Sequence, residues 1–127
     1  VLIMSTAELK TALEWTFMFE CEVPEDVAQT LAAGETAVCA YKTIRDVAVF
    51  TNKRLIVRDS QGITGQKVET YSLPYKSIVM YSTENSGMLV DCNCEVEIWT
   101  LIGQVKIRLG YDVDVRKFDK LLSDAIL

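Results

Sequence analysis

Seven basic side chains between positions 42 and 76 are the residues best suited to chemistry in this 127-residue chain, because the same stretch contains only three acids. Lysine and arginine bind phosphate and carboxylate groups through charge-assisted hydrogen bonds. The sequence therefore contains a basic island that is a candidate site for an anion or a partner. Its members are Lys42, Arg45, Lys53, Arg54, Arg58, Lys67 and Lys76.

Two interpretations of the basic island stay open. Either it binds a phospholipid headgroup or another anion, or its charges are solvated and keep strand edges soluble. Only Thr43 and Ile44 separate Lys42 from Arg45, so this turn has little backbone with which to surround a headgroup. The formal net charge of −5 also disfavours nucleic acid and anionic membranes as partners. We therefore favour solvated charges and expect neither nucleic acid nor a membrane as a partner.

Residue combinations typical of enzymes are missing from the sequence. The chain has no histidine to serve as a base, and no glycine-rich phosphate loop follows a predicted strand. Glu95 and Glu97 share one face of an alternating segment, which is typical of the solvent side of a strand. We therefore predict a protein that is not an enzyme and uses no cofactor.

The cysteine pattern disfavours a metal site. The four cysteines are Cys21, Cys39, Cys92 and Cys94. Cys92 and Cys94 lie two apart in a strand-like segment, so they point to one face and are poorly placed to form a disulfide with each other. Without histidine, a zinc site would have to recruit its remaining ligands from elsewhere in the fold. We expect no metal, and reduced cysteines that pack as small apolar residues.

Positions 1–33 show helical periodicity. Ser5-Thr6-Ala7-Glu8 has the spacing of a capping box, which marks the start of a helix. Its apolar stripe continues through Leu9, Ala12, Leu13 and Phe17. Pro24 suits the start of a second, short helix, which we expect to end at Gly34. The sequence thus predicts an N-terminal helical extension over residues 1–33, followed by a domain over residues 34–127.

The apolar period changes to two after Thr36, and turn residues then recur at the spacing of a meandering antiparallel sheet. We expect seven strands, near residues 36–43, 46–51, 54–59, 66–73, 77–84, 90–101 and 103–110. Asp112 or Asp114 then caps a final helix. The apolar face of that helix is Val115, Phe118, Leu122, Ala125 and Ile126. The pattern predicts a mainly β (α+β) fold, in which the C-terminal helix closes the open end of a strongly bent sheet.

Two dipeptides have local interpretations. Arg45-Asp46 is expected to form an ion pair at the entry of the hairpin that follows it. Pro74-Tyr75 is expected to end a strand, because proline lacks the amide that a central strand requires.

The length of the chain fits one domain. No apolar run approaches the roughly 18 residues that a membrane span requires. Val1-Leu2-Ile3-Met4 is apolar, but it lacks the basic leader and the cleavage site of a secretory signal. We therefore expect a cytoplasmic location.

A combination of short motifs carries a family resemblance. The positions that match are Gly34-Glu35, Tyr41-Lys42, Arg45-Asp46, Phe50 to Ile56, Asp59, Gln61-Gly62, Thr64-Gly65, Lys67-Val68-Glu69, Pro74 to Ile78, Glu84, Gly87 and Glu95. This combination covers most of residues 34–100 and resembles the bacterial pleckstrin homology (PH) domain family.

The resemblance implies a PH-like split barrel capped by the last helix, without an established enzymatic activity. It also implies assembly into cyclic homo-oligomers, typically pentamers, through head-to-tail contacts. We therefore interpret the chain as a ring-forming homo-oligomeric module that binds an unidentified protein partner. The alternative is a module that binds an anion or a phospholipid headgroup through the basic island.

Overall fold

The computed structural model describes residues 13–61, 66–84 and 94–127. Its strands are β1 (Leu13–Cys21), β2 (Ala37–Thr43), β3 (Asp46–Thr51), β4 (Arg54–Gln61), β5 (Lys67–Pro74), β6 (Ile78–Thr83), β7 (Glu95–Thr100) and β8 (Gln104–Leu109). Its helices are α2 (Glu25–Ala28), the 3₁₀ turn η1 (Tyr75–Ser77) and α3 (Val115–Ile126). No helix in these ranges has the length and hydrophobicity of a membrane span.

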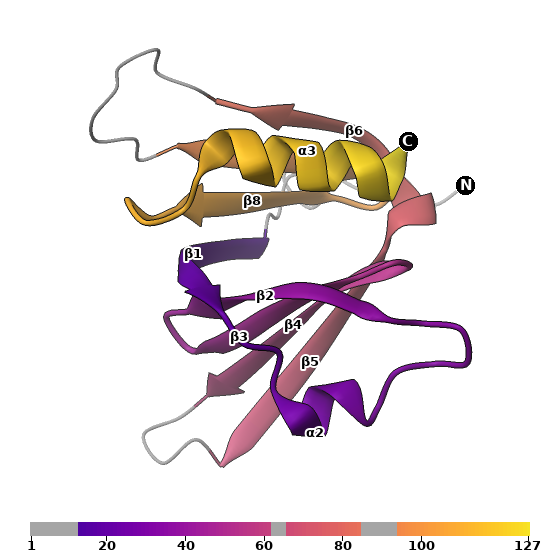
Figure 1. The fold of residues 1–127 in the computed structure, drawn as a ribbon. Coiled ribbons are helices and arrows are strands. Elements are labelled where there is room, and N and C mark those ends of the chain that lie inside the picture. Colours follow the sequence, from indigo (N-terminus) through magenta and orange to yellow (C-terminus); the bar gives the residue numbers. More distant parts are fainter. Residues whose placement is uncertain (1–12, 62–65, 85–93) are drawn as a thin grey trace, which may run out of the picture.

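The eight strands form one curled sheet in the order β5-β4-β3-β2-β1-β8-β7-β6. Figure 1 shows α3 lying across the half formed by β6, β7 and β8, while α2 lies beside the opposite half. All seven predicted strands after Thr36 are confirmed, with starts and ends close to those expected. The exception is the start of β7 at Glu95, since residues 90–93 lie outside the described ranges. Pro74 ends β5 as predicted.

The predicted N-terminal helix is wrong where the structure describes it, because Leu13–Cys21 is a strand. Leu13 and Phe17 fit a helical stripe, but with Trp15 they also alternate with polar residues, which is the strand period. β1 pairs in parallel with β8 and in antiparallel with β2, so tertiary pairing decides between the two periods. The capping box at Ser5 lies outside the described residues.

The predicted second helix is confirmed at its start and shorter than expected. Pro24 is the N-cap of α2, but the helix ends at Ala28 instead of continuing to Gly34. Gly34 lies in the following loop with φ of +75°, a conformation that glycine adopts without steric cost. α2 buries Val27 against a cluster on the outer side of β2, β3 and β4, which consists of Ala40, Val47, Val49 and Ile56.

The main core is an aromatic cluster between the two halves of the sheet. Phe118 of α3 contacts Phe17, Tyr41 and Phe50, with ring centroids 5.9, 5.6 and 5.4 Å away. The predicted C-terminal helix and its cap are confirmed, because Asp114 accepts a hydrogen bond from the amide of Arg116 at 3.0 Å. α3 is therefore held at its start by the cap and along its length by burial.

We expect Phe118→Ala to lower the free energy of unfolding by about 3–5 kcal/mol, because it removes the side chain at the centre of the aromatic cluster and leaves a cavity. Urea unfolding followed by circular dichroism measures the change. Lys120→Ala, an exposed position on the same helix, is the control and should change stability by less than about 0.5 kcal/mol. Equal effects of the two substitutions would show that α3 does not close the core.

Candidate functional site

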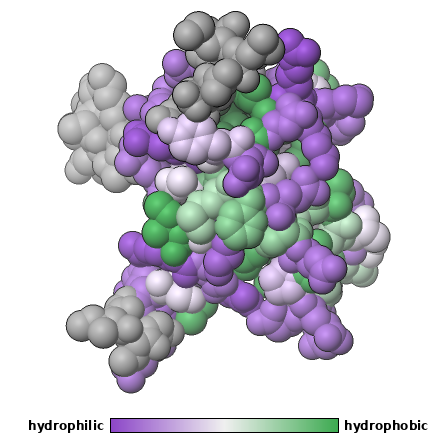
Figure 2. All heavy atoms as spheres, turned by 60° about the vertical axis from the view of Figure 1, so that its left-hand side comes forward, coloured by the Kyte–Doolittle hydropathy of each residue, from purple (hydrophilic) through white to green (hydrophobic). Residues whose placement is uncertain are grey.

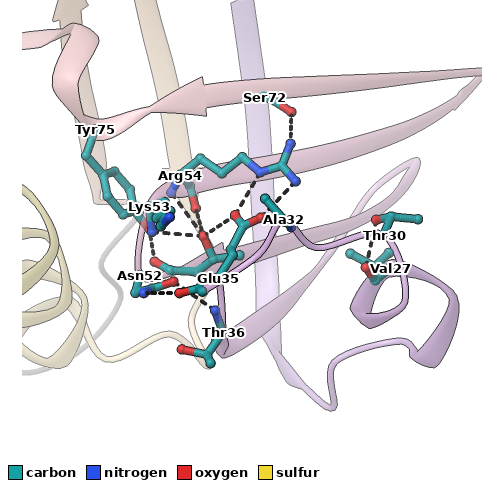
Figure 3. Close-up of polar contacts among 12 residues, drawn as sticks. Val27, Thr30, Ala32, Glu35, Thr36, Asn52, Lys53, Arg54, Ser72 and Tyr75 are labelled. Atoms are coloured by element: carbon teal, nitrogen blue, oxygen red, sulfur yellow. Dashed lines mark hydrogen bonds and ion pairs between the residues drawn. The ribbon is translucent and has the colours of Figure 1, made fainter.

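Arg54, a member of the basic island, is bound to a buried carboxylate. Its Nε and Nη2 donate to Glu35 at 2.8 and 3.0 Å, as Figure 3 shows. Glu35, which is 7% exposed, also accepts hydrogen bonds from the Ala32 amide at 2.8 Å and the Thr51 hydroxyl at 2.7 Å. These bonds, led by those from Arg54, lower the pKa of Glu35 from 4.5 to about 2. The group therefore fastens the loop after α2 to the β3–β4 hairpin.

The tip of the same hairpin holds the backbone of this loop. The Asn52 side chain accepts from the Thr36 amide at 2.8 Å and donates to the Gly34 carbonyl at 3.1 Å. Lys53, a second member of the basic island, donates from Nζ to the Ala33 carbonyl at 3.3 Å. Asn52 and Lys53 thus have structural contacts in a turn that the sequence predicted.

Two further arginines of the basic island are also bound to carboxylates. Arg58 donates from Nε to Asp46 at 2.7 Å and from Nη1 to Asp26 at 2.5 Å. Arg45 forms a bidentate ion pair with Asp59, in which Nε and Nη2 donate to the two carboxylate oxygens at 2.6 and 2.9 Å. The predicted Arg45–Asp46 ion pair is therefore wrong. Arg45 lies in the turn before β3 and reaches Asp59 of β4, whereas Asp46 pairs with Arg58 of the same strand.

The lysines of the basic island are spread over the molecule. Lys67 lies 3.8 Å from Glu69, in an exposed pair. Lys53 and Lys76 line a cavity of about 300 Å³ with the end of α3. Arg45 and Arg58 line another, of about 330 Å³, with β1 and the β2–β3 turn. Lys42 is exposed on β2 and lines neither of these cavities. The seven residues therefore do not converge on one pocket, and anion binding by them stays a prediction.

The described cysteines differ in whether they form a disulfide. Cys21 and Cys39 are free thiols, and burial raises the pKa of Cys39 to about 11, which makes it a poor nucleophile. Cys94 is buried and disulfide-bonded, so the prediction of a reduced thiol is wrong for this residue. Cys92 lies outside the described residues. Within the described ranges, no group of three or more Cys, Asp or Glu side chains is arranged to hold a metal ion.

Sequence reasoning missed the exposed apolar residues at one end of the sheet. Val79 and Met80 on the edge strand β6 are 60% and 54% exposed. Leu101 and Ile102, in the turn between β7 and β8, are 84% and 81% exposed. The available signal was the position of this aliphatic pair directly before the turn residue Gly103. Figure 2 shows a hydrophobic area near the centre of the face that it presents.

We expect Glu35→Gln to lower the free energy of unfolding at neutral pH by about 2 kcal/mol, because it removes the charge that binds Arg54. Since folding lowers the pKa of Glu35 from 4.5 to about 2, its contribution is fully present above pH 4.5 and is lost as the pH falls toward 2. Urea unfolding at several pH values should therefore show a weaker pH dependence in this window for the variant. Glu69→Gln, in an exposed pair, is the control and should retain the wild-type dependence.

Comparison with known proteins gives consistent results. The family model described as Bacterial PH domain matches residues 8–126. Two Bacillus subtilis relatives are described as uncharacterized proteins. YjqA is 49% identical over 77 residues, and YozO is 29% identical over 93 residues. The match covers 61% of this chain and 61% of YjqA, against 73% of this chain and 80% of YozO.

Solved structures with the same fold include two from Shewanella. A DUF1696 family protein with a pleckstrin-homology domain from Shewanella loihica has a TM-score of 0.74 and 34% identity. The match covers 87% of this chain and 99% of the Shewanella loihica chain. A pleckstrin homology domain from Shewanella amazonensis has a TM-score of 0.65 and 35% identity, and the match covers 81% of this chain and 84% of that domain. The predicted PH-like fold is thus confirmed, and the chain belongs to the bacterial PH domain family.

Proposed function

We propose that this bacterial PH domain is a non-enzymatic module that forms a ring of identical subunits and binds a protein partner through the assembled surface. The observation that carries the proposal is the exposed apolar surface at the β6 edge. Val79, Met80, Leu101 and Ile102 are each more than half exposed. They are neighbours in the fold, because β6 pairs with β7 from Ile78↔Thr100 to Thr83↔Val96. Several large exposed apolar residues in one region of the fold are typical of a protein–protein contact.

The strand order supports contact between copies. β5 and β6 are the two ends of the sheet, so each has one edge without a strand partner among the described residues. An uncovered edge is a template for association unless it is covered or charged. β5 carries the charges of Lys67 and Glu69 on either side of the exposed Val68, whereas β6 presents Val79 and Met80 and has no charged residue. The β6 edge is therefore the one that gains most from cover by another subunit.

The family resemblance implies that a contact through this surface is heterologous. When two different surfaces of a subunit meet, the subunits add head to tail, and they form a ring if the rotation between them closes. The family resemblance implies rings of about five subunits. A ring presents several copies of the same surface, so weak contacts with a partner multiply into avidity.

The lipid alternative has less support from the geometry. Arg45, Arg54 and Arg58 already bind carboxylates, which reduces their attraction for an incoming phosphate. We place the domain in the cytoplasm as part of the same proposal.

Size-exclusion chromatography with light scattering at low micromolar concentration should give the mass of about five protomers. The mass should persist at high salt, because apolar contacts are not screened. Met80→Lys, which places a charge on the exposed β6 edge, should reduce the mass to that of one protomer. Val68→Lys on β5, at a position of similar exposure, is the control. A wild-type protein with the mass of one protomer would remove the proposal.

Sedimentation with vesicles of phosphatidylglycerol and phosphatidylcholine at low salt separates the two functions. We expect no association, because the three island arginines are already paired and the chain carries a net charge of −5. Association that is lost in Arg58→Ala would support the lipid alternative through the basic island. Myoglobin, or another protein that does not bind vesicles, sets the background.

A further inference from the structure

We propose that β5 of one copy pairs with β6 of the next copy, so that the sheet of one subunit continues into the sheet of its neighbour. This inference rests on the proposed ring and names the two strand edges that meet in it. We call them the β5 edge and the β6 edge, meaning the side of each strand that faces away from its partner strand. The backbone groups on these edges decide what can cover them.

The β5 edge presents a regular array of backbone groups. In an antiparallel pair, successive residues direct their N–H and C=O alternately toward and away from the partner strand. The Tyr75 amide donates to the Lys53 carbonyl at 3.1 Å, in register with the pairing of β5 and β4. Odd-numbered residues of β5 therefore face β4. The residues with an outward N–H are Val68, Thr70 and Ser72.

The β6 edge presents the same kind of array. The Glu84 amide donates to the Glu95 carbonyl at 2.8 Å, in register with the pairing of Ser82 with Glu97. Even-numbered residues at this end of β6 therefore face β7. Tyr81 and Thr83 direct their N–H and C=O outward, and no second strand lies beside them within the described ranges.

The two edges do not cover each other within one chain. β5 and β6 follow each other through η1, yet they are the two ends of the sheet. Figure 1 shows the two strands running apart from the corner at η1. In the described part of the chain, each edge is thus open to a strand from another molecule.

The backbone groups specify the kind of surface that can cover either edge. A backbone N–H or C=O that is buried without a partner costs free energy comparable to a lost hydrogen bond. A cover over these edges must therefore supply acceptors and donors at the spacing of a strand. A helix face or an apolar ligand does not supply this array, whereas the edge of a second sheet does.

The β5 edge of a second copy fits the β6 edge in three respects. β5 has three outward-facing residues against two on β6, so every outward-facing group of β6 can be paired. β6 carries no charged residue, so Lys67 and Glu69 of β5 meet no like charge. Each strand also has an exposed apolar side chain, since Val68 is 52% and Met80 is 54% exposed. A second copy therefore supplies hydrogen bonds and apolar area together, without a charge conflict.

Pairing between the β5 edge and the β6 edge is heterologous, because the two strands differ. Each copy has one edge of each kind, so subunits add head to tail and form a ring if the rotation between them closes. Val68→Lys, the control for the proposed ring, keeps the outward N–H and C=O of β5 and is compatible with this contact.

Proline substitutions test the contact one edge at a time. At an edge residue whose N–H faces outward, proline removes a donor from the contact and leaves the ladder inside the subunit intact. The β5 variant is Thr70→Pro and the β6 variant is Thr83→Pro, and circular dichroism checks that both are folded. The controls are Thr70→Val and Thr83→Val, which keep the N–H. Thr83→Val also loses the hydroxyl bond to Asp119 at 3.1 Å, as Thr83→Pro does, so the comparison isolates the backbone donor.

We expect each proline variant alone to have the mass of one protomer by light scattering at high micromolar concentration, and both valine variants to keep the mass of the ring. An equimolar mixture of the proline variants should give a 1:1 heterodimer, because each retains the edge that the other has lost. A ring that persists in either proline variant, or a mixture that stays monomeric, would overturn the contact while leaving the ring itself intact. A dimer of Thr70→Pro alone would also overturn it, because β6 would then pair with itself.

Amide hydrogen exchange in the wild-type ring, followed residue by residue, tests the same contact without a substitution. The amides of Thr70 and Thr83 should be protected in the assembled protein, because each donates to the neighbouring copy. Fast exchange of both amides in an intact ring would overturn the strand pairing. A wild-type protein with the mass of one protomer would instead overturn the proposed function.

Discussion

The pairing of β1 with both of its neighbours is the constraint on which the architecture depends. β1 is the strand through which β2 to β5 and β6 to β8 become one sheet, because it pairs with β2 on one side and with β8 on the other. Phe17 is paired on both sides, with Thr43 and with Leu109, and its ring lies in the aromatic cluster under α3. Gly110 adds a steric condition, since a Cβ there would lie 2.7 Å from the Met18 carbonyl oxygen. The bend of the sheet, the position of α3 and the closure of the core therefore follow from one strand.

Charge in the first half of the sheet is used within the fold. The sequence shows an excess of bases between positions 42 and 76, and the structure shows that part of this excess is balanced by acids from outside the stretch. Glu35 and Asp26 belong to the acidic N-terminal third, and they bind Arg54 and Arg58 of β4. Net charge along the sequence is thus a poor guide to free charge on the surface, because the fold brings distant segments of opposite sign together. At Arg54 and Arg58, local excess charge attaches distant segments of the chain to each other.

Much of the fold could be predicted from the sequence, and the predictions that were wrong have physical causes. Strands after Thr36 were predictable because alternation and turn chemistry are both local signals. β1 was not, because Leu13 and Phe17 fit the helical and the strand period equally well, and its partner β8 lies far along the chain. Ion pairs depend on strand register, so Arg45–Asp59 could not be inferred from adjacency. The exposed pair Leu101–Ile102 could have been identified, since two aliphatic residues stand at turn positions where Gly, Asn, Asp or Ser usually occur.

The exposed side chains of the described residues suit contact with a protein surface better than contact with a small polar ligand. A small-molecule site needs a few convergent polar groups that are free to bind. In the described part of the chain, the residues of the basic island do not converge on one pocket. The described residues also leave several large apolar side chains and two strand edges exposed. Covering apolar side chains lowers the free energy in proportion to the area that is removed from water. A second protein surface can cover such an area, whereas a small polar ligand cannot.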